Sequence, residues 1–126
     1  MDGLNPGPGA EQVAPGHEMV AARKVEPMHF LVLAWDRATE EGVARRDGAR
    51  PDHAAAIRER WERGEVVLGA GILDDAGVVR GSLVVVDLPG AADVEAYLAT
   101  EPFVTQDVWE RVEVHPLRVP DFYLTR

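Results

Sequence analysis

The sequence predicts an α+β domain of the ferredoxin-like type, with the element order βαββαβ and an antiparallel sheet that carries both helices on one face. Two observations predict this fold. Four short segments rich in β-forming residues alternate with two helical segments in that order. Hydrophobic residues make up 46% of the 126 residues, which is enough to form one core. The chain has no cysteine, so this core must hold the domain without disulfides.

The first strand is predicted at residues 28–35, a short apolar run. Residues 36–48 are polar and contain glycine, and we expect them to be mostly loop. The first helix should begin near Pro51, because the N–H groups of a first helical turn form no hydrogen bond within the helix and proline lacks this group. It should end at Gly64, since glycine is typical of helix C-termini. The apolar face that this helix should turn inward consists of Ala54, Ile57 and Trp61.

The second half of the chain supplies the other elements. Strands are predicted at residues 65–72 and 79–87, on either side of a turn at 74–77. The second helix is predicted at residues 91–100 and the last strand at 109–116. The inward residues of the second helix should be Val94, Tyr97 and Leu98. Alternation divides the last strand into one face with Glu110, Val112 and Val114 and another with Trp109, Arg111, Glu113 and His115.

The first three strands are apolar on both faces, although two helices can cover only one face of the sheet. A monomer would therefore expose a large apolar patch, which usually marks an interface. We predict a symmetric homodimer in which two sheets pack face to face in a dimeric α/β barrel or sandwich. A monomer whose sheet is fully covered is the alternative.

Residues 1–27 are rich in glycine and proline and show no periodicity, which predicts a flexible extension. The domain is expected over residues 28–120, and residues 121–126 are expected to form a C-terminal tail. The first residues lack the basic start and apolar core of a signal peptide. We therefore expect a cytoplasmic location.

The charge balance excludes several partners. The net charge is −9, from 13 basic and 22 acidic residues. Such a chain is a poor binder of nucleic acid, whose phosphates require clustered cations, and an anionic membrane surface would repel it. No apolar run approaches the roughly 18 residues that a spanning helix needs. We expect neither a nucleic-acid partner nor a membrane partner.

The motif search points to a site without metal or cofactor. The histidines show no HExxH pattern and no closely spaced pair, and the chain has no P-loop and no GxGxxG. His53 is the most informative residue. At the predicted helix start, its imidazole should be neutral near pH 7, because the positive end of a helix disfavours a second positive charge. A neutral imidazole can act as a general base. The alternative is a hydrogen-bonded or solvated polar residue at a helix start.

Several short segments in a characteristic order resemble the YciI-like (YCII-related) domain family. They are Arg50-x-x-His53, Trp61-Glu-Arg-Gly64, Leu68-Gly-Ala-Gly71, Gly81-Ser82, Glu101-Pro102-Phe103-Val104 and Val112-Glu-Val-His-Pro116. The resemblance covers about residues 28–119. It implies the βαββαβ fold of the dimeric α/β-barrel proteins, and therefore a homodimer.

The resemblance also implies a site. Family members carry a histidine where this chain has His53, and an Asp-Pro-aromatic motif where it has Glu101-Pro102-Phe103. We therefore take His53 and Glu101 as a candidate catalytic pair, in which the carboxylate orients the imidazole. The two side chains should approach within about 4 Å and open into a cleft. Glutamate in place of aspartate is a departure, since it moves the carboxylate by about the length of one C–C bond.

Three further residues are candidates for binding a small organic substrate. Arg50 could clamp an anionic group, or it could be a surface arginine paired with Asp47 or Asp52. Phe103 and Trp35 could line an apolar pocket, or they could simply belong to the core. The predicted function is that of a cofactor-independent enzyme that catalyses proton transfer, isomerisation or elimination. The alternative is a non-catalytic dimer that binds a ligand or serves as an accessory protein.

Overall fold

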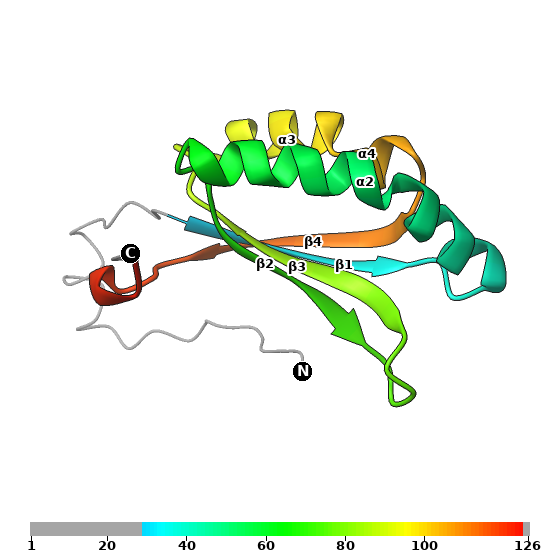
Figure 1. Cartoon of the computed structure of the whole chain (residues 1–126). Coiled ribbons are helices and arrows are strands. Elements are labelled where there is room, and N and C mark those ends of the chain that lie inside the picture. The colour runs from blue at the N-terminus through cyan, green and yellow to red at the C-terminus, as the bar shows by residue number, and fades with distance from the viewer. Residues whose placement is uncertain (1–28, 125–126) are drawn as a thin grey trace, which may run out of the picture.

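Figure 1 shows a four-stranded antiparallel sheet with helices packed on one face, as the element order predicted. The computed structural model describes residues 29–124. In chain order the elements are β1 (His29–Asp36), α2 (Glu40–Glu62), β2 (Val66–Leu73), β3 (Val79–Val86), α3 (Ala91–Thr100), α4 (Pro102–Thr105), β4 (Trp109–Leu117) and the 3-10 helix η2 (Asp121–Leu124). The strand order in the sheet is β2-β3-β1-β4.

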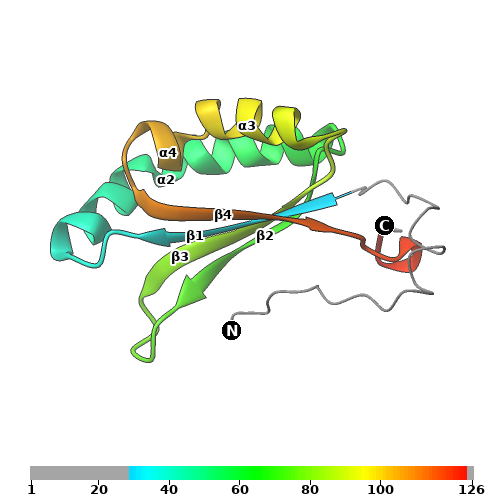
Figure 2. The ribbon, with the colours of Figure 1, turned by 180° about the vertical axis from the view of Figure 1, so that it is seen from behind.

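The core lies between the sheet and its helical layer, which both views show on the same side of the sheet (Figures 1 and 2). Alternate residues of β1 and β3 face the helices, and α3 supplies the inward residues that the sequence predicted. Members of this core are Phe30, Val32, Val84, Val86, Val94, Tyr97 and Phe103, with Leu98 partly buried against them. The predicted ferredoxin-like fold is therefore confirmed.

The first helix is longer than predicted, because residues 40–48 are helical and not loop. Thr39 caps the helix, and its side chain accepts a hydrogen bond from the Gly42 N–H. Acidic residues in the first turn interact favourably with the positive end of the helix dipole. Pro51 therefore lies inside α2, where it removes one backbone hydrogen bond. Figure 1 shows α2 bending along its length, for which an internal proline is the usual cause.

This longer helix changes the position of His53, which lies near the middle of α2 and not in its first turn. The predicted influence of a helix N-terminus on the imidazole therefore does not apply, because that effect is confined to the first turn. The predicted inward face also has a different role. Ala54 and Trp61 are exposed, and only Ile57 packs partly against the core.

The last strand also differs in one respect. Trp109 is buried among the core residues, although simple alternation grouped it with Arg111. The register shifts between Trp35 and Asp36 of β1, so that Arg111 pairs with Trp35 while Trp109 pairs with Asp36. An irregularity of this kind adds a residue and reverses the side-chain alternation on one side of it.

The other face of the sheet carries no helix within residues 29–124. Residues directly opposite in antiparallel strands share a face, so the register assigns Leu33, Leu83 and Glu113 to this bare side. Its central apolar residues are Leu31, Leu33, Trp35, Leu83 and Val85. Its β4 edge carries Arg111, Glu113 and His115. The expectation that the sheet is apolar on both faces therefore holds for β1 and β3.

The two predicted terminal segments lie wholly or partly outside the described residues. The predicted extension over residues 1–27 lies outside them, as do residues 125–126 of the predicted tail. Residues 121–124 of that tail form η2. Within residues 29–124, no helix combines the length and the apolarity needed to cross a membrane.

Candidate functional site

His53 and Glu101 meet although 48 positions separate them in the chain. The Nδ1 atom of His53 lies 2.6 Å from Oε2 of Glu101, well inside the predicted limit of about 4 Å. His53 comes from α2, and Glu101 lies at the junction of α3 and α4. The side chain of His53 is 18% exposed, and that of Glu101 is fully buried. The longer glutamate side chain therefore reaches the imidazole.

Local structure holds the Glu101 carboxylate in place. Glu101 is the N-cap of α4, and its Oε2 accepts a hydrogen bond from the Phe103 N–H at 3.0 Å. Pro102 occupies the first position of this short helix, where proline is favoured. The hydroxyl of Tyr97 donates to Oε1 at 2.8 Å. Both carboxylate oxygens are thus satisfied by donors from three different residues.

These donors determine the charge of the pair. Burial raises the pKa of Glu101, but the hydrogen bond from His53, with those from the Phe103 N–H and Tyr97, outweighs burial and holds this pKa below its usual value. Glu101 is therefore an ionised carboxylate, which can only accept hydrogen bonds. The proton between the two side chains consequently belongs to Nδ1 of His53. In a ring that carries this single proton, Nε2 is the basic nitrogen.

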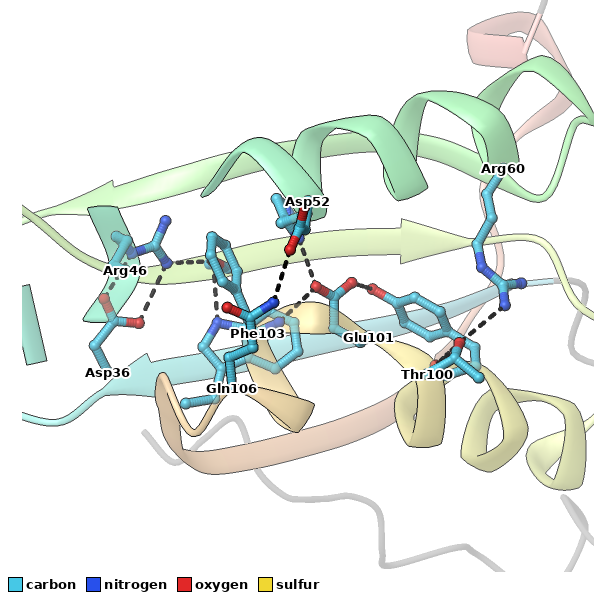
Figure 3. A network of polar contacts seen from close by, with 12 residues as sticks. Asp36, Arg46, Asp52, Arg60, Thr100, Glu101, Phe103 and Gln106 are labelled. Carbon is cyan, nitrogen blue, oxygen red and sulfur yellow. Dashed lines mark hydrogen bonds and ion pairs between the residues drawn. The ribbon is translucent and has the colours of Figure 1, made fainter. Parts of the chain in front are cut away.

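A second group of contacts surrounds Phe103. The ring of His53 stacks on Phe103 with centroids 4.0 Å apart, and the guanidinium of Arg46 lies 4.5 Å from the centroid of the same ring. Arg46 is itself held by Asp36, at 2.6 and 3.2 Å, and donates to Ser82 Oγ at 2.6 Å. Figure 3 shows Glu101 in the middle of this network, between the Asp36–Arg46 pair and the contact of Arg60 with Thr100. The network limits the rotation of the His53 ring.

The site opens into a cleft of about 790 Å³ between α2 and the β2–β3 edge of the sheet. His53 and Phe103 line it together with the exposed face of α2. Its other lining residues are Arg46, Arg50, Ala54, Ile57, Arg58 and Trp61 from α2, Val66–Gly71 from β2, and Ser82, Leu83 and Val84 from β3. The volume is in the range of small-molecule sites. The α2 face predicted to be core is therefore a wall of this cleft.

The structure brings four of the five candidate residues together. His53, Arg50 and Phe103 line the cleft, and Glu101 lies directly behind His53. Arg50 also forms an exposed ion pair with Asp47 at 3.1 Å, one of the alternatives considered from the sequence. Trp35 is not part of this group. It lies on the bare face of the sheet, where Arg111 packs over its ring at 4.2 Å.

Two residues of the site, Arg46 and Tyr97, were not among the candidates predicted from the sequence. The expectation of a loop over residues 36–48 excluded Arg46, although positions 46, 50 and 53 follow helical spacing. Tyr97 was recognised only as a core residue, and its spacing of four from Glu101 along α3 was the available signal. Within residues 29–124, no group of three or more histidine, aspartate or glutamate side chains is arranged to hold a metal ion.

We expect Tyr97→Phe to lower the free energy of unfolding by about 1–3 kcal/mol, because Oε1 of Glu101 loses its buried donor. Chemical denaturation followed by circular dichroism measures this loss. Tyr123→Phe is the matched control, since Tyr123 is 66% exposed and the same hydroxyl is removed. Equal stabilities of the two variants would show that the Tyr97 hydroxyl does not hold Glu101.

Comparison with known proteins agrees with this architecture. The YCII-related domain matches residues 28–118. The chain is also similar to the structure of 5-chloro-2-hydroxyhydroquinone dehydrochlorinase from Burkholderia phenoliruptrix in complex with 2,5-dihydroxybenzoquinone. That likeness has a TM-score of 0.65 at 17% sequence identity, and covers 75% of this chain and 98% of the other. At this identity it supports the fold alone. No curated protein matches the chain in sequence.

Proposed function

The chain belongs to the YCII-related domain family, and from that premise we propose that it is a small-molecule enzyme in which His53 transfers protons and Glu101 orients it. The observation that carries this proposal is the 2.6 Å contact between the two side chains at the wall of an open cleft. A buried carboxylate behind a partly exposed histidine is the arrangement that a general base requires.

The chemistry follows from the tautomer. Nε2 of His53 takes a proton from a C–H or O–H group of the substrate, and the electron pair left behind forms a new double bond. In an elimination, a neighbouring group then leaves with its bonding electrons. In an isomerisation, Nε2 returns the proton to a different atom. Glu101 remains ionised throughout and stabilises the imidazolium that forms.

The lining of the cleft supports a small organic substrate. Ile57 and Trp61 provide apolar surface, and Arg50 provides a cation one helical turn from His53. The similar structure from Burkholderia phenoliruptrix was solved with 2,5-dihydroxybenzoquinone, a flat hydroxylated ring. Hydroxylated and chlorinated hydroquinones are therefore the first substrates to test on this chain.

The test is an activity screen of the purified chain. We expect saturable turnover of at least one ring compound, measured as chloride release from 5-chloro-2-hydroxyhydroquinone or as proton exchange and double-bond migration in unchlorinated analogues. Turnover that persists in His53→Ala would contradict the assignment of the base. Absence of turnover across the panel, with saturable binding retained, would instead favour the second function below.

A non-catalytic dimer that binds a ligand is the second candidate. Glu101 caps α4, and both of its carboxylate oxygens accept hydrogen bonds, which a purely structural residue would also show. In this case His53→Ala changes binding affinity without any associated reaction. The two functions therefore differ in whether a product forms.

We further propose that the protein is a homodimer in which the bare faces of two sheets pack together. Leu31, Leu33 and Leu83 form an apolar centre, and Arg111 and Glu113 on the β4 edge offer both charges to a symmetric partner. The cytoplasmic location also remains a proposal, which rests on the sequence alone.

Substituting glutamate for Leu33 should convert this dimer to a monomer, because two symmetric carboxylates would then be buried in the interface. Size-exclusion chromatography with light scattering measures the mass. The control is Val104→Glu, which adds the same charge on α4 in the helical layer. A wild-type chain that already runs as a monomer would exclude the proposed dimer, as would a Leu33→Glu variant that remains dimeric.

A further inference from the structure

The charges that line the cleft have the opposite sign to the protein as a whole. The chain carries a net charge of −9, yet the lining residues include three arginines and one histidine. Among residues 29–124, none of those that line the cleft is an aspartate or glutamate. Glu101 is the nearest carboxylate to His53, but its side chain is fully buried behind the imidazole. A molecule entering the cleft therefore meets cations first.

Two arginines gather at one end of the cleft, and apolar residues dominate the other end, where Arg58 is the remaining cation and pairs with Glu62. Because α2 and β2 run in opposite directions along the chain, Arg46 lies near the Gly71–Ser82 pair, as its hydrogen bond to Ser82 shows. At the other end, Trp61 lies near Val66, where β2 begins. His53 lies between these two ends on α2. The cleft thus matches a molecule with one polar end and an apolar body.

The floor of the cleft lacks side chains at two positions. Gly69 and Gly71 pair with Val84 and Ser82, which face the helices, so their missing side chains would have pointed towards α2. A Cβ added to Gly69 would meet only a backbone oxygen, at 3.7 Å. The space above Gly69 is therefore open, and a flat group can lie there between the strand and the helix.

The two arginines that gather at one end of the cleft, Arg46 and Arg50, differ in how tightly other side chains hold them. Arg46 is held by Asp36, Ser82 and the Phe103 ring, and its side chain is 11% exposed. Arg50 forms one ion pair with Asp47, in which both side chains are 64% exposed. Exposed pairs of this kind contribute little and exchange readily. Arg50 is consequently the cation that can turn to meet a ligand, whereas the charge of Arg46 is already balanced by Asp36.

We propose that the cleft binds flat organic anions, with the anionic group on Arg50 and the apolar body over Gly69, towards Ile57 and Trp61. This proposal names the substrate class of the proposed enzyme, and it rests on the proposed function, in which this cleft is the substrate site. The guanidinium pairs with a carboxylate through two parallel hydrogen bonds, which adds orientation to attraction. Bound in this way, the body of the anion passes His53, which lies on the same face of α2.

The test compares two probes of the same shape, 2-naphthoate and 2-naphthamide, by titration calorimetry and by heteronuclear NMR of the full chain. We expect the wild-type protein to bind the anion at least about ten-fold more tightly than the amide, as a charge-assisted hydrogen bond predicts. The Arg50→Gln variant should reduce this ratio to about two or less. Arg63→Gln is the matched control, because it removes the same charge from the end of α2 outside the cleft and should preserve the ratio.

The Gly69→Val variant tests whether the apolar body of the ligand lies over Gly69, on the floor of the cleft. Valine is favourable in a strand, so this variant should fold normally while its side chain blocks the cleft and weakens binding of both probes about ten-fold or more. Equal affinities of the wild type for the two probes, or a ratio unchanged in Arg50→Gln, would overturn the proposal. So would the absence of saturable binding of 2-naphthoate at millimolar concentration, or full binding to Gly69→Val.

Failure of the proposed function gives a different result. His53→Ala should keep the preference for the anion, because the charge of Arg50 is untouched. Anion binding without turnover of any substrate would therefore contradict the enzyme but support the anion site. Turnover of neutral substrates, with no preference for anions in binding, would support the enzyme but contradict the anion site.

Discussion

Replacing Glu101 by alanine should lower the free energy of unfolding by about 3–5 kcal/mol, because a fully buried side chain loses its packing and several hydrogen bonds at once. Three donors lose their acceptor together: the Tyr97 hydroxyl, the Phe103 N–H and Nδ1 of His53. A cavity adds to the loss, since the side chain is fully buried. Chemical denaturation followed by circular dichroism measures the effect. The control is Glu95→Ala, which removes the same side chain from an exposed position of α3.

Two conservative variants separate the roles of charge and reach. Glu101→Gln keeps the length of the side chain, so this variant should be destabilised less than the alanine variant. Some loss remains, because its NH₂ group must face one of the three donors. Glu101→Asp keeps the charge but shortens the side chain by about one C–C bond, so it cannot hold His53 and Tyr97 together. If all three variants matched Glu95→Ala in stability, the carboxylate would not hold the site.

The same carboxylate predicts how stability changes with pH. The pKa of Glu101 is lower in the folded protein than its ordinary value, because the donors outweigh burial. The stabilisation by Glu101 is therefore fully present above the ordinary carboxyl pKa of about 4.3 and is lost as the pH falls through the lower, folded value. Below about pH 5, the wild type should lose more stability than Glu101→Gln does, which the same denaturation curves show.

Replacing His53 by alanine should reduce kcat/KM by about 10²–10⁴-fold, the usual contribution of a positioned general base. The proposed reaction uses Nε2, which no other side chain of the described cleft replaces, since its remaining cations are arginines. Steady-state kinetics on the substrate found by the screen measures the loss. Substrate affinity should change far less, because Arg50 and the apolar wall remain.

His53→Gln distinguishes a base from a structural residue. A glutamine amide N–H can still donate to Glu101, so this variant should keep most of the stability of the wild type. It cannot take up a proton near neutral pH, and it should be as inactive as the alanine variant. A glutamine variant with near wild-type turnover would refute the assignment of His53, and the histidine would then serve only to satisfy Glu101.

The order of the elements was predictable, because short β-forming runs and turn residues act locally. The start of α2 was not, since Gly42, Gly48 and Pro51 each weaken a helix, and only the Thr39 cap and packing on the sheet outweigh them. The short helix α4 was missed for a related reason. Its signal is Glu101 as N-cap followed by Pro102, which is visible only after the end of α3 is known.

The amino-acid pattern was sufficient to predict the fold class and, through the resemblance to a family, the pairing of His53 with Glu101. It could not place Trp35 and Trp109 on their faces, because a single irregular register between β1 and β4 reverses the alternation. Only the tertiary structure showed that Tyr97 and the Phe103 N–H complete the hydrogen bonding of Glu101. It also turned the apolar face of α2 into a cleft wall. Such roles depend on which surfaces meet, and helical periodicity is the same whether a face meets the core or a cleft.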